Sequence, residues 1–105
     1  MKKESKFQTE VIQEVKRRFP DCVVFKNDAR QGFPDLLVLH ETTWAALECK
    51  RNKSAVKEPN QEYYVDRFGK MSFAAFIHPE NREEVLDDLQ RTFSARGAAC
   101  ISQPL

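Results

Sequence analysis

The sequence contains no apolar run near the length that a membrane span requires, which is about 20 residues. Its lysine-rich start is not followed by the apolar segment of an export signal. Among 105 residues there are only 3 cysteines, Cys22, Cys49 and Cys100, and their spacing is unlike that of a zinc site. We therefore expect free thiols in a reducing, intracellular compartment, and no membrane partner.

An excess of charge of one sign is also missing. The net charge of +1 argues against a protein that coats nucleic acid generically. A DNA-facing surface needs only local positive potential, however, and basic residues gather in the first helix and in the loop 51–58. Solvated lysines on exposed faces would produce the same pattern. The basic residues of the helical group are Lys2, Lys3, Lys6, Lys16, Arg17 and Arg18.

Hydrophobic periodicity and turn residues predict one α/β domain spanning residues 1–105, because a chain of this length has room for a single core. We expect helices over 4–19 and 59–68, the second ending at Gly69 as its C-cap, and a last helix from Pro79 to about residue 93. Strands are expected over 22–26, 36–39, 44–47 and 72–77. The two central runs are uniformly apolar, which predicts strands covered on both faces. The sequence from residue 95 onward has no assigned element.

Charged residues stand at the ends of the two central runs. Asp35 precedes the run 36–39, and the run 44–47 leads into Glu48, Cys49 and Lys50. Because side chains alternate along a strand, Glu48 and Lys50 share a face while Cys49 points away. If the runs pair as a hairpin, Asp35 lies beside Glu48. Two adjacent carboxylates suit Mg²⁺ or Mn²⁺, and a nearby ammonium suits a phosphate oxygen, which predicts a metal-dependent phosphodiesterase site.

The same residues resemble a known family. Asp35 and the tripeptide from Glu48 to Lys50, with Gly32 and Pro34 ahead of the aspartate, are similar to the PD-(D/E)xK nuclease superfamily. The resemblance is closest to the VRR-NUC branch, which is related to Holliday-junction resolvases. A motif this short occurs by chance, so its weight comes from the matching order of elements between about residues 4 and 69. The resemblance implies a restriction-endonuclease-like α/β fold, with a central mixed four-stranded sheet flanked by helices in the order αβββαβα.

The resemblance also implies roles for individual residues. Asp35 and Glu48, joined by the main-chain carbonyl of Cys49, would bind Mg²⁺ or Mn²⁺. Lys50 would orient or help deprotonate the attacking water, or stabilise the transition state. Gln61, at the start of the helix that follows, matches a family glutamine that supports the site or contacts DNA.

A further metal ligand is expected from the first helix. At ~100° per residue Glu4 falls in line with the apolar positions Val11 and Val15, and a glutamate of the first helix often joins the metal site in the resembled family. A frayed helix end, where a glutamate complements the helix dipole, explains the same residue equally well. Glu10 is the alternative ligand.

We expect DNA as the substrate. Branched or flapped DNA, such as a four-way junction, is expected in preference to a specific duplex sequence. The stand-alone members of the resembled branch imply a homodimer and a bacterial or phage-infected cytoplasm. Two other interpretations remain: an inactive nuclease fold that binds DNA or serves assembly, and an ordinary α/β interaction domain in which Glu48 and Lys50 form a surface ion pair. The residues expected to contact DNA are Lys26, Arg30, Arg51, Lys53 and Lys57.

Overall fold

The computed structural model describes the backbone of residues 3–28 and 31–102 and the side chains of residues 5–28 and 31–95. The order of its elements is αβββαβα, as predicted from the sequence. The elements are α1 (Lys3–Arg18), β1 (Val23–Lys26), β2 (Leu36–His40), β3 (Thr43–Cys49), α2 (Pro59–Met71), β4 (Phe73–Ile77) and α3 (Arg82–Ser102).

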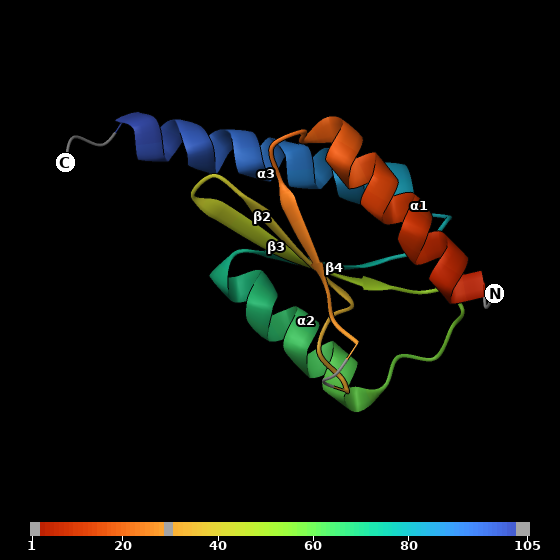
Figure 1. The fold of residues 1–105 in the computed structure, drawn as a ribbon. Helices are drawn as coiled ribbons and strands as arrows, with labels where there is room; N and C mark the ends of the chain where they lie inside the picture. The colour runs from red at the N-terminus through yellow and green to blue at the C-terminus, as the bar shows by residue number, and fades with distance from the viewer. Residues whose placement is uncertain (1–2, 29–30, 103–105) are drawn as a thin grey trace.

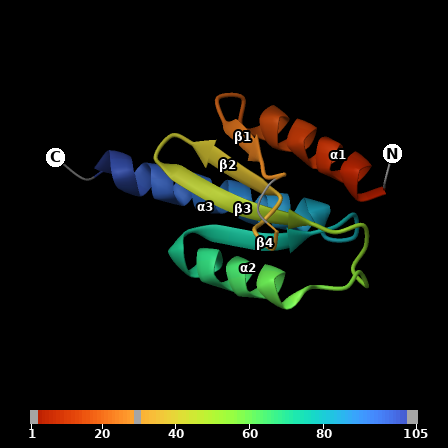
Figure 2. The same cartoon turned by 60° about the horizontal axis from the view of Figure 1, so that its bottom comes forward.

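The strands form one four-stranded sheet in the order β1-β2-β3-β4 (Figure 2). The pairs β1–β2 and β2–β3 are antiparallel, and β3 and β4 are parallel because the chain crosses back through α2. The expected mixed sheet is therefore confirmed. The register of β2 and β3 places Leu36 opposite Leu47, and its continuation by one step places Asp35 opposite Glu48.

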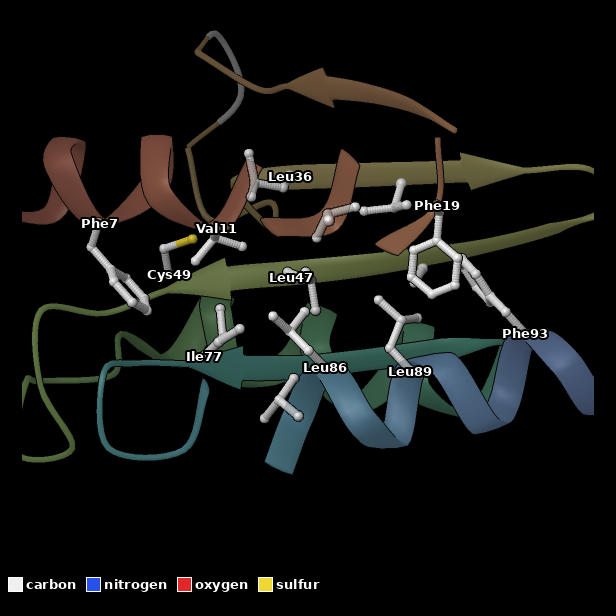
Figure 3. Close-up of a cluster of buried hydrophobic side chains, with 14 residues drawn as sticks. Phe7, Val11, Phe19, Leu36, Leu47, Cys49, Ile77, Leu86, Leu89 and Phe93 are labelled. Atoms are coloured by element: carbon white, nitrogen blue, oxygen red, sulfur yellow. The ribbon is translucent and has the colours of Figure 1, made fainter. Parts of the chain in front are cut away.

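The helices lie in two layers (Figure 1). Helices α1 and α3 cover one face of the sheet, and α2 packs on β3 and β4 from the other face. The main core lies between the sheet and the α1–α3 layer, where side chains from both helices and from β2, β3 and β4 meet (Figure 3). Among the described residues no helix is long and apolar enough to cross a membrane. The buried core residues include Phe7, Val11, Val15, Phe19, Leu36, Val38, Leu47, Cys49, Ile77, Leu86, Leu89 and Phe93.

The expectation that both central strands are covered on both faces is wrong for β2. Leu36 and Val38 are buried beneath α1 and α3, but Leu39 on the other face is 42% exposed. On the neighbouring β1, Val23 and Phe25 are each 59% exposed. The reason is that α2 packs on β3 and β4 and leaves the outer face of β1 and β2 open.

The ends of two helices also differ from the sequence prediction. Gly69 is not a C-cap: α2 continues to Met71, and the N–H of Ser72 bonds to the carbonyl of Phe68 at 2.8 Å. The last helix begins at Arg82 and not at Pro79, because Asn81 occupies the turn before it. The Asn81 side chain accepts the N–H of His78 at 2.8 Å, which ends the extended chain before the helix starts. The unassigned sequence after residue 95 continues α3 to Ser102.

Candidate active site

The mouth of the β2–β3 hairpin is closed by two acidic side chains. The backbone N–H of Asp35 donates to Oε1 of Glu48 at 3.1 Å, and the backbone N–H of Cys49 donates to Oδ2 of Asp35 at 2.9 Å. Each carboxylate therefore accepts a hydrogen bond from the opposite strand. These reciprocal bonds hold the two carboxylates side by side, as the hairpin register predicted.

Behind the carboxylates lies a network that joins β3 to α2. Lys50 Nζ donates to Oε1 of Gln61 at 2.7 Å, and Gln61 Nε2 donates to Oε2 of Glu48 at 2.6 Å. Lys50 Nζ itself lies 3.9 Å from Glu48 Oε2. Glu48 at the end of β3 and Lys50 just after it reach the same glutamine, so their side chains lie on the same side of the chain. The side chain of Cys49 lies on the other face, beside Phe7 and Val11 in the core (Figure 3).

The two orientations of the Gln61 amide are not equivalent in this network. Its oxygen accepts from the ammonium of Lys50 and from the backbone N–H of Glu58 at 3.0 Å, while its nitrogen faces a carboxylate. A flipped amide would place its nitrogen against two donors and its oxygen against Glu48. The bond to Glu58 also anchors the side chain to the first turn of α2. Gln61 therefore holds the carboxylate of Glu48 and the ammonium of Lys50 apart in one fixed arrangement.

The charged pair at this site is deeply buried. Glu48 is 3% exposed and Lys50 is 6% exposed, although charged side chains are rarely this buried unless they are paired. Taking both charges out of water is expensive, and their separation of 3.9 Å makes the direct attraction weaker than in a contact pair. Buried charges held in this way, beside a second carboxylate, are typical of a functional site more than of a stabilising ion pair.

The donor atoms present suit a hard divalent cation. Carboxylate oxygens accept more than one partner, so the backbone bonds to Asp35 and Glu48 do not exhaust them. In a strand the N–H and C=O of one residue point the same way, so the carbonyl of Cys49 faces the side on which its N–H meets Asp35. Two carboxylates and a carbonyl leave room for the water ligands that Mg²⁺ retains. The described side chains contain no group of three or more His, Cys, Asp or Glu that could hold a metal.

The third acidic ligand is not found among the described side chains. Glu4 lies in the first turn of α1, and its side chain is outside the described residues. The alternative, Glu10, is turned to a different partner: its Oε1 lies 3.5 Å from Nη1 of Arg82 on α3. Glu10 thus contributes to the contact between the two helices.

The expected DNA-binding residues differ in their surroundings. Lys26, Arg51 and Lys53 are exposed. Lys57 is also exposed, and its Nζ lies 4.7 Å from the centre of the Phe76 ring, a cation–π contact. Arg30 is outside the described residues.

The basic group on α1 needs one correction. Arg18 does not project into solvent but bonds to three acidic side chains. Its side chain is 12% exposed, and it connects α1 to α3. Arg18 therefore belongs to the scaffold and not to the expected basic surface.

Residues that the sequence did not single out surround the N-terminus of α2. Gln31, Glu58 and Asn60 line a cavity of about 450 Å³ that Gln61 also borders. The one sequence signal for this cavity was Gly32, which has a φ of 90°, a value that L side chains rarely adopt. Gly32 lies directly against Asn60.

Comparisons with known proteins extend the description of the fold. No family model and no curated protein matches the chain. A solved structure described as a VRR_NUC domain protein is similar over 90% of both chains, with a TM-score of 0.65 and 17% sequence identity. Another, described as a VRR_NUC domain, matches 83% of this chain and 97% of its own, with a TM-score of 0.57 and 24% identity. The chain therefore has the restriction-endonuclease-like fold of VRR_NUC domains.

Proposed function

We propose that this chain is a metal-dependent DNA endonuclease of the VRR-NUC type. The observation that carries the proposal is the convergence of Asp35, Glu48 and Lys50 at one edge of the sheet, with Gln61 bonded to two of them. These residues correspond to the Asp…Glu-x-Lys pattern of the resembled family, and they occur on a fold shared with VRR_NUC domains. Such a site hydrolyses phosphodiester bonds.

Asp35 and Glu48, with the carbonyl of Cys49, are the residues that would hold Mg²⁺ or Mn²⁺. A divalent ion bound there lowers the pKa of a coordinated water and neutralises charge on the phosphate. Asp35 also accepts from the N–H of Cys49, and Glu48 accepts from the N–H of Asp35, so the backbone fixes the position of each carboxylate. Glu4 remains the proposed additional ligand from α1.

Lys50 supplies positive charge on the same face. An ammonium has three donors, so its hydrogen bond to Gln61 leaves it able to bind a phosphate oxygen or an attacking water. Gln61 prevents Lys50 from collapsing onto Glu48, because it lies between their charged atoms. Lys50 is thereby available to stabilise the negative charge that develops on the phosphate.

The DNA backbone is proposed to lie along the exposed cations near the site. Arg51, Lys53 and Lys57 follow the active-site strand, and Lys26 ends the edge strand. Arg30, the fifth proposed contact, is outside the described residues. Contacts of this type bind phosphates and carry no base sequence. DNA binding should therefore weaken steeply with salt and depend little on sequence.

Branched DNA, such as a four-way junction, is the proposed substrate, and a homodimer is the proposed form. A two-fold dimer presents two equivalent sites for paired nicks. Leu86 and Leu89 of α3 point into the core, so these apolar side chains are not available to a dimer interface. The open face of β1 and β2 is the better candidate, because Val23, Phe25 and Leu39 are exposed there beside an apolar cavity of about 330 Å³.

The test is cleavage of a labelled four-way junction beside a flap, a linear duplex and a single strand, in Mn²⁺ and in EDTA. Light scattering on the same samples gives the mass in solution. Asp35→Ala, Glu48→Ala and Lys50→Ala should each lose cleavage, while the control Lys70→Ala should not. Lys70 is a matched control because its side chain is 76% exposed and pairs only with Asp66 among the described residues.

Each outcome separates one part of the proposal. Symmetric, metal-dependent nicks on the junction by a dimer support the whole of it. Metal-dependent cleavage of flaps or single strands retains the active site and changes the substrate. DNA binding without any cleavage would instead indicate an inactive nuclease fold that serves as a binding module. Unchanged cleavage by Asp35→Ala or Glu48→Ala would overturn the site.

A further inference from the structure

The cavity at the N-terminus of α2 adjoins the proposed active site and shares Gln61 with it. Its volume is about 450 Å³, which falls in the range of roughly 300–1,000 Å³ typical of small-molecule pockets. It lies between the loop that precedes β2 and the first turn of α2. Its lining residues are Gln31, Gly32, Glu58, Pro59, Asn60 and Gln61.

The chemistry of this lining does not suit a phosphate. Among the described residues no lysine or arginine lines the cavity, and the carboxylate of Glu58 would repel an anion. The polar groups that it does offer are the exposed carboxamides of Gln31 and Asn60 together with that carboxylate. Carboxamides donate to and accept from base edges, and a carboxylate accepts from an exocyclic amine. The lining therefore matches a nucleobase.

Gly32 forms the wall of the cavity and leaves no space for a side chain. A Cβ at this position would lie 2.7 Å from Cβ of Asn60, closer than real Cβ contacts come. The backbone at Gly32 therefore packs directly against Asn60 of α2 and borders the cavity. A flat backbone wall allows a planar ligand to approach closely.

An aromatic side chain stands near the same helix turn. Tyr63 is 58% exposed and follows Asn60 by three residues, so the two lie on neighbouring positions of the helix surface. Its neighbour Tyr64 packs against Phe33, with ring centres 4.3 Å apart, and belongs to the scaffold. Tyr63 does not line the cavity, but it is an exposed ring about one helical turn from Asn60, and such a ring can stack on a base.

From these observations we propose that the cavity binds an unstacked nucleobase next to the phosphate that is cut. The inference rests on the proposed nuclease function and extends it, because Gln61 connects the cavity to Glu48 and Lys50. A base reaches such a cavity only after it leaves the stack. Unstacking costs least where a base is unpaired, as at a branch point or in a single strand. The cavity would therefore make cleavage selective for DNA structure without reading sequence.

The test compares two single-stranded oligonucleotides of the same length, one with bases and one abasic at the central positions. Their affinities are measured by fluorescence anisotropy in EDTA, so that cleavage plays no part. The wild-type chain should bind the oligonucleotide with bases about tenfold more tightly, the scale of one base contact. Asn60→Ala and Gln31→Ala should reduce that ratio several-fold, because they remove base partners from the cavity.

The control is Gln13→Ala, which removes an exposed carboxamide from α1, outside the cavity lining. It should keep the wild-type ratio. A ratio that is unchanged in both cavity variants, or equal affinity of the wild-type chain for both oligonucleotides, overturns the inference even if the chain cleaves DNA. A ratio that falls only in the cavity variants upholds it, even if cleavage fails and the proposed nuclease function is lost.

Discussion

Two clusters of charged side chains in this molecule use the same residue types in opposite ways. At the edge of the sheet, Glu48 and Lys50 are 3% and 6% exposed, and an amide lies between them. Between α1 and α3, Arg18 binds acidic side chains that lie mostly near water, such as Glu83, whose side chain is 73% exposed. Glu48 and Lys50, here called the buried cluster, are shielded from water and their charged atoms are not in direct contact. Arg18 and its acidic partners, here called the surface cluster, are partly exposed and their charged atoms are in contact.

The difference shows which cluster stabilises the fold. Arg18 bonds to Asp87 at 2.9 Å and to Glu14 at 3.0 Å, and the bond to Asp87 raises the pKa of the guanidinium above its usual range. Burial of Arg18 opposes this rise, but Glu83 and Asp87 keep much of their hydration, at 73% and 54% exposed, so the pairs lose less hydration than a fully buried pair would. Glu48 and Lys50 lose their hydration without forming a contact pair. The buried cluster is therefore expected to add little to the stability of the fold, and the surface cluster to add more.

The largest expected effect comes from removing both charges of the buried cluster in one variant. The double variant Glu48→Gln with Lys50→Met should lose cleavage by at least about 100-fold, because both the carboxylate proposed to bind the metal and the cation are gone. Its free energy of unfolding should stay within about 1 kcal/mol of wild type, or rise, since replacing a buried ion pair is often neutral or stabilising. Urea denaturation and the junction assay measure the two effects. A loss of several kcal/mol would show that the buried cluster is part of the scaffold.

The sequence predicted the buried cluster better than the surface cluster, for a physical reason. Strand alternation has a period of two, so the register of one hairpin was enough to bring Asp35 beside Glu48. The position of Gln61 was also predicted, but its two bonds depend on the angle at which α2 crosses the sheet. The partners of Arg18 on α3 lie 65 to 72 positions away along the chain, and no local pattern indicates which way an arginine at a helix end will turn.

The open face of the sheet was missed for a related reason. The residues of β2 are apolar on both faces, a composition that usually means both faces are covered, so it gave no sign of the open face. Which faces are covered depends on where the crossover helix lies, and α2 lies over β3 and β4. The start of α3 was missed because Pro79 is a common first residue of a helix, whereas the turn before Arg82 depends on side-chain bonds of Asn81 to His78 and Phe76.

The surface cluster offers the next test, with a smaller expected effect. Arg18→Met should lower the free energy of unfolding by about 1–2 kcal/mol, since each partly exposed ion pair contributes at most about 1 kcal/mol. Cleavage per folded molecule should not change. Arg17→Met is a matched control on the same helix: Arg17 is 71% exposed and pairs only with Glu14 among the described residues, so its loss should cost about 0.5 kcal/mol or less. Equal destabilisation by both variants would contradict the role assigned to Arg18.

The smallest effect concerns the pH dependence of the same cluster. The hydrogen bonds from Arg18 and then Arg17 hold the pKa of the Glu14 carboxyl below its usual value. A folded-state pKa that is lowered contributes stability above the unfolded pKa of about 4.3, and that contribution is lost as the pH falls through the folded value. Glu14→Gln should therefore destabilise the chain at pH 7 by up to about 1 kcal/mol and have less effect at about pH 3.

Urea denaturation at the two pH values measures this difference, with Glu62→Gln as the control. Glu62 is exposed on α2, and its side chain forms no ion pair in the described structure. If Glu14→Gln costs the same free energy at both pH values, the glutamate stabilises α1 through packing or helix propensity, and not through charge. A pH-dependent cost that also disappears in the Arg18→Met background would assign the coupling to Arg18, because removing one partner of an ion pair abolishes the contribution of the other. The charge interactions of the surface cluster would then account for the part of the stability that Glu14 loses in acid.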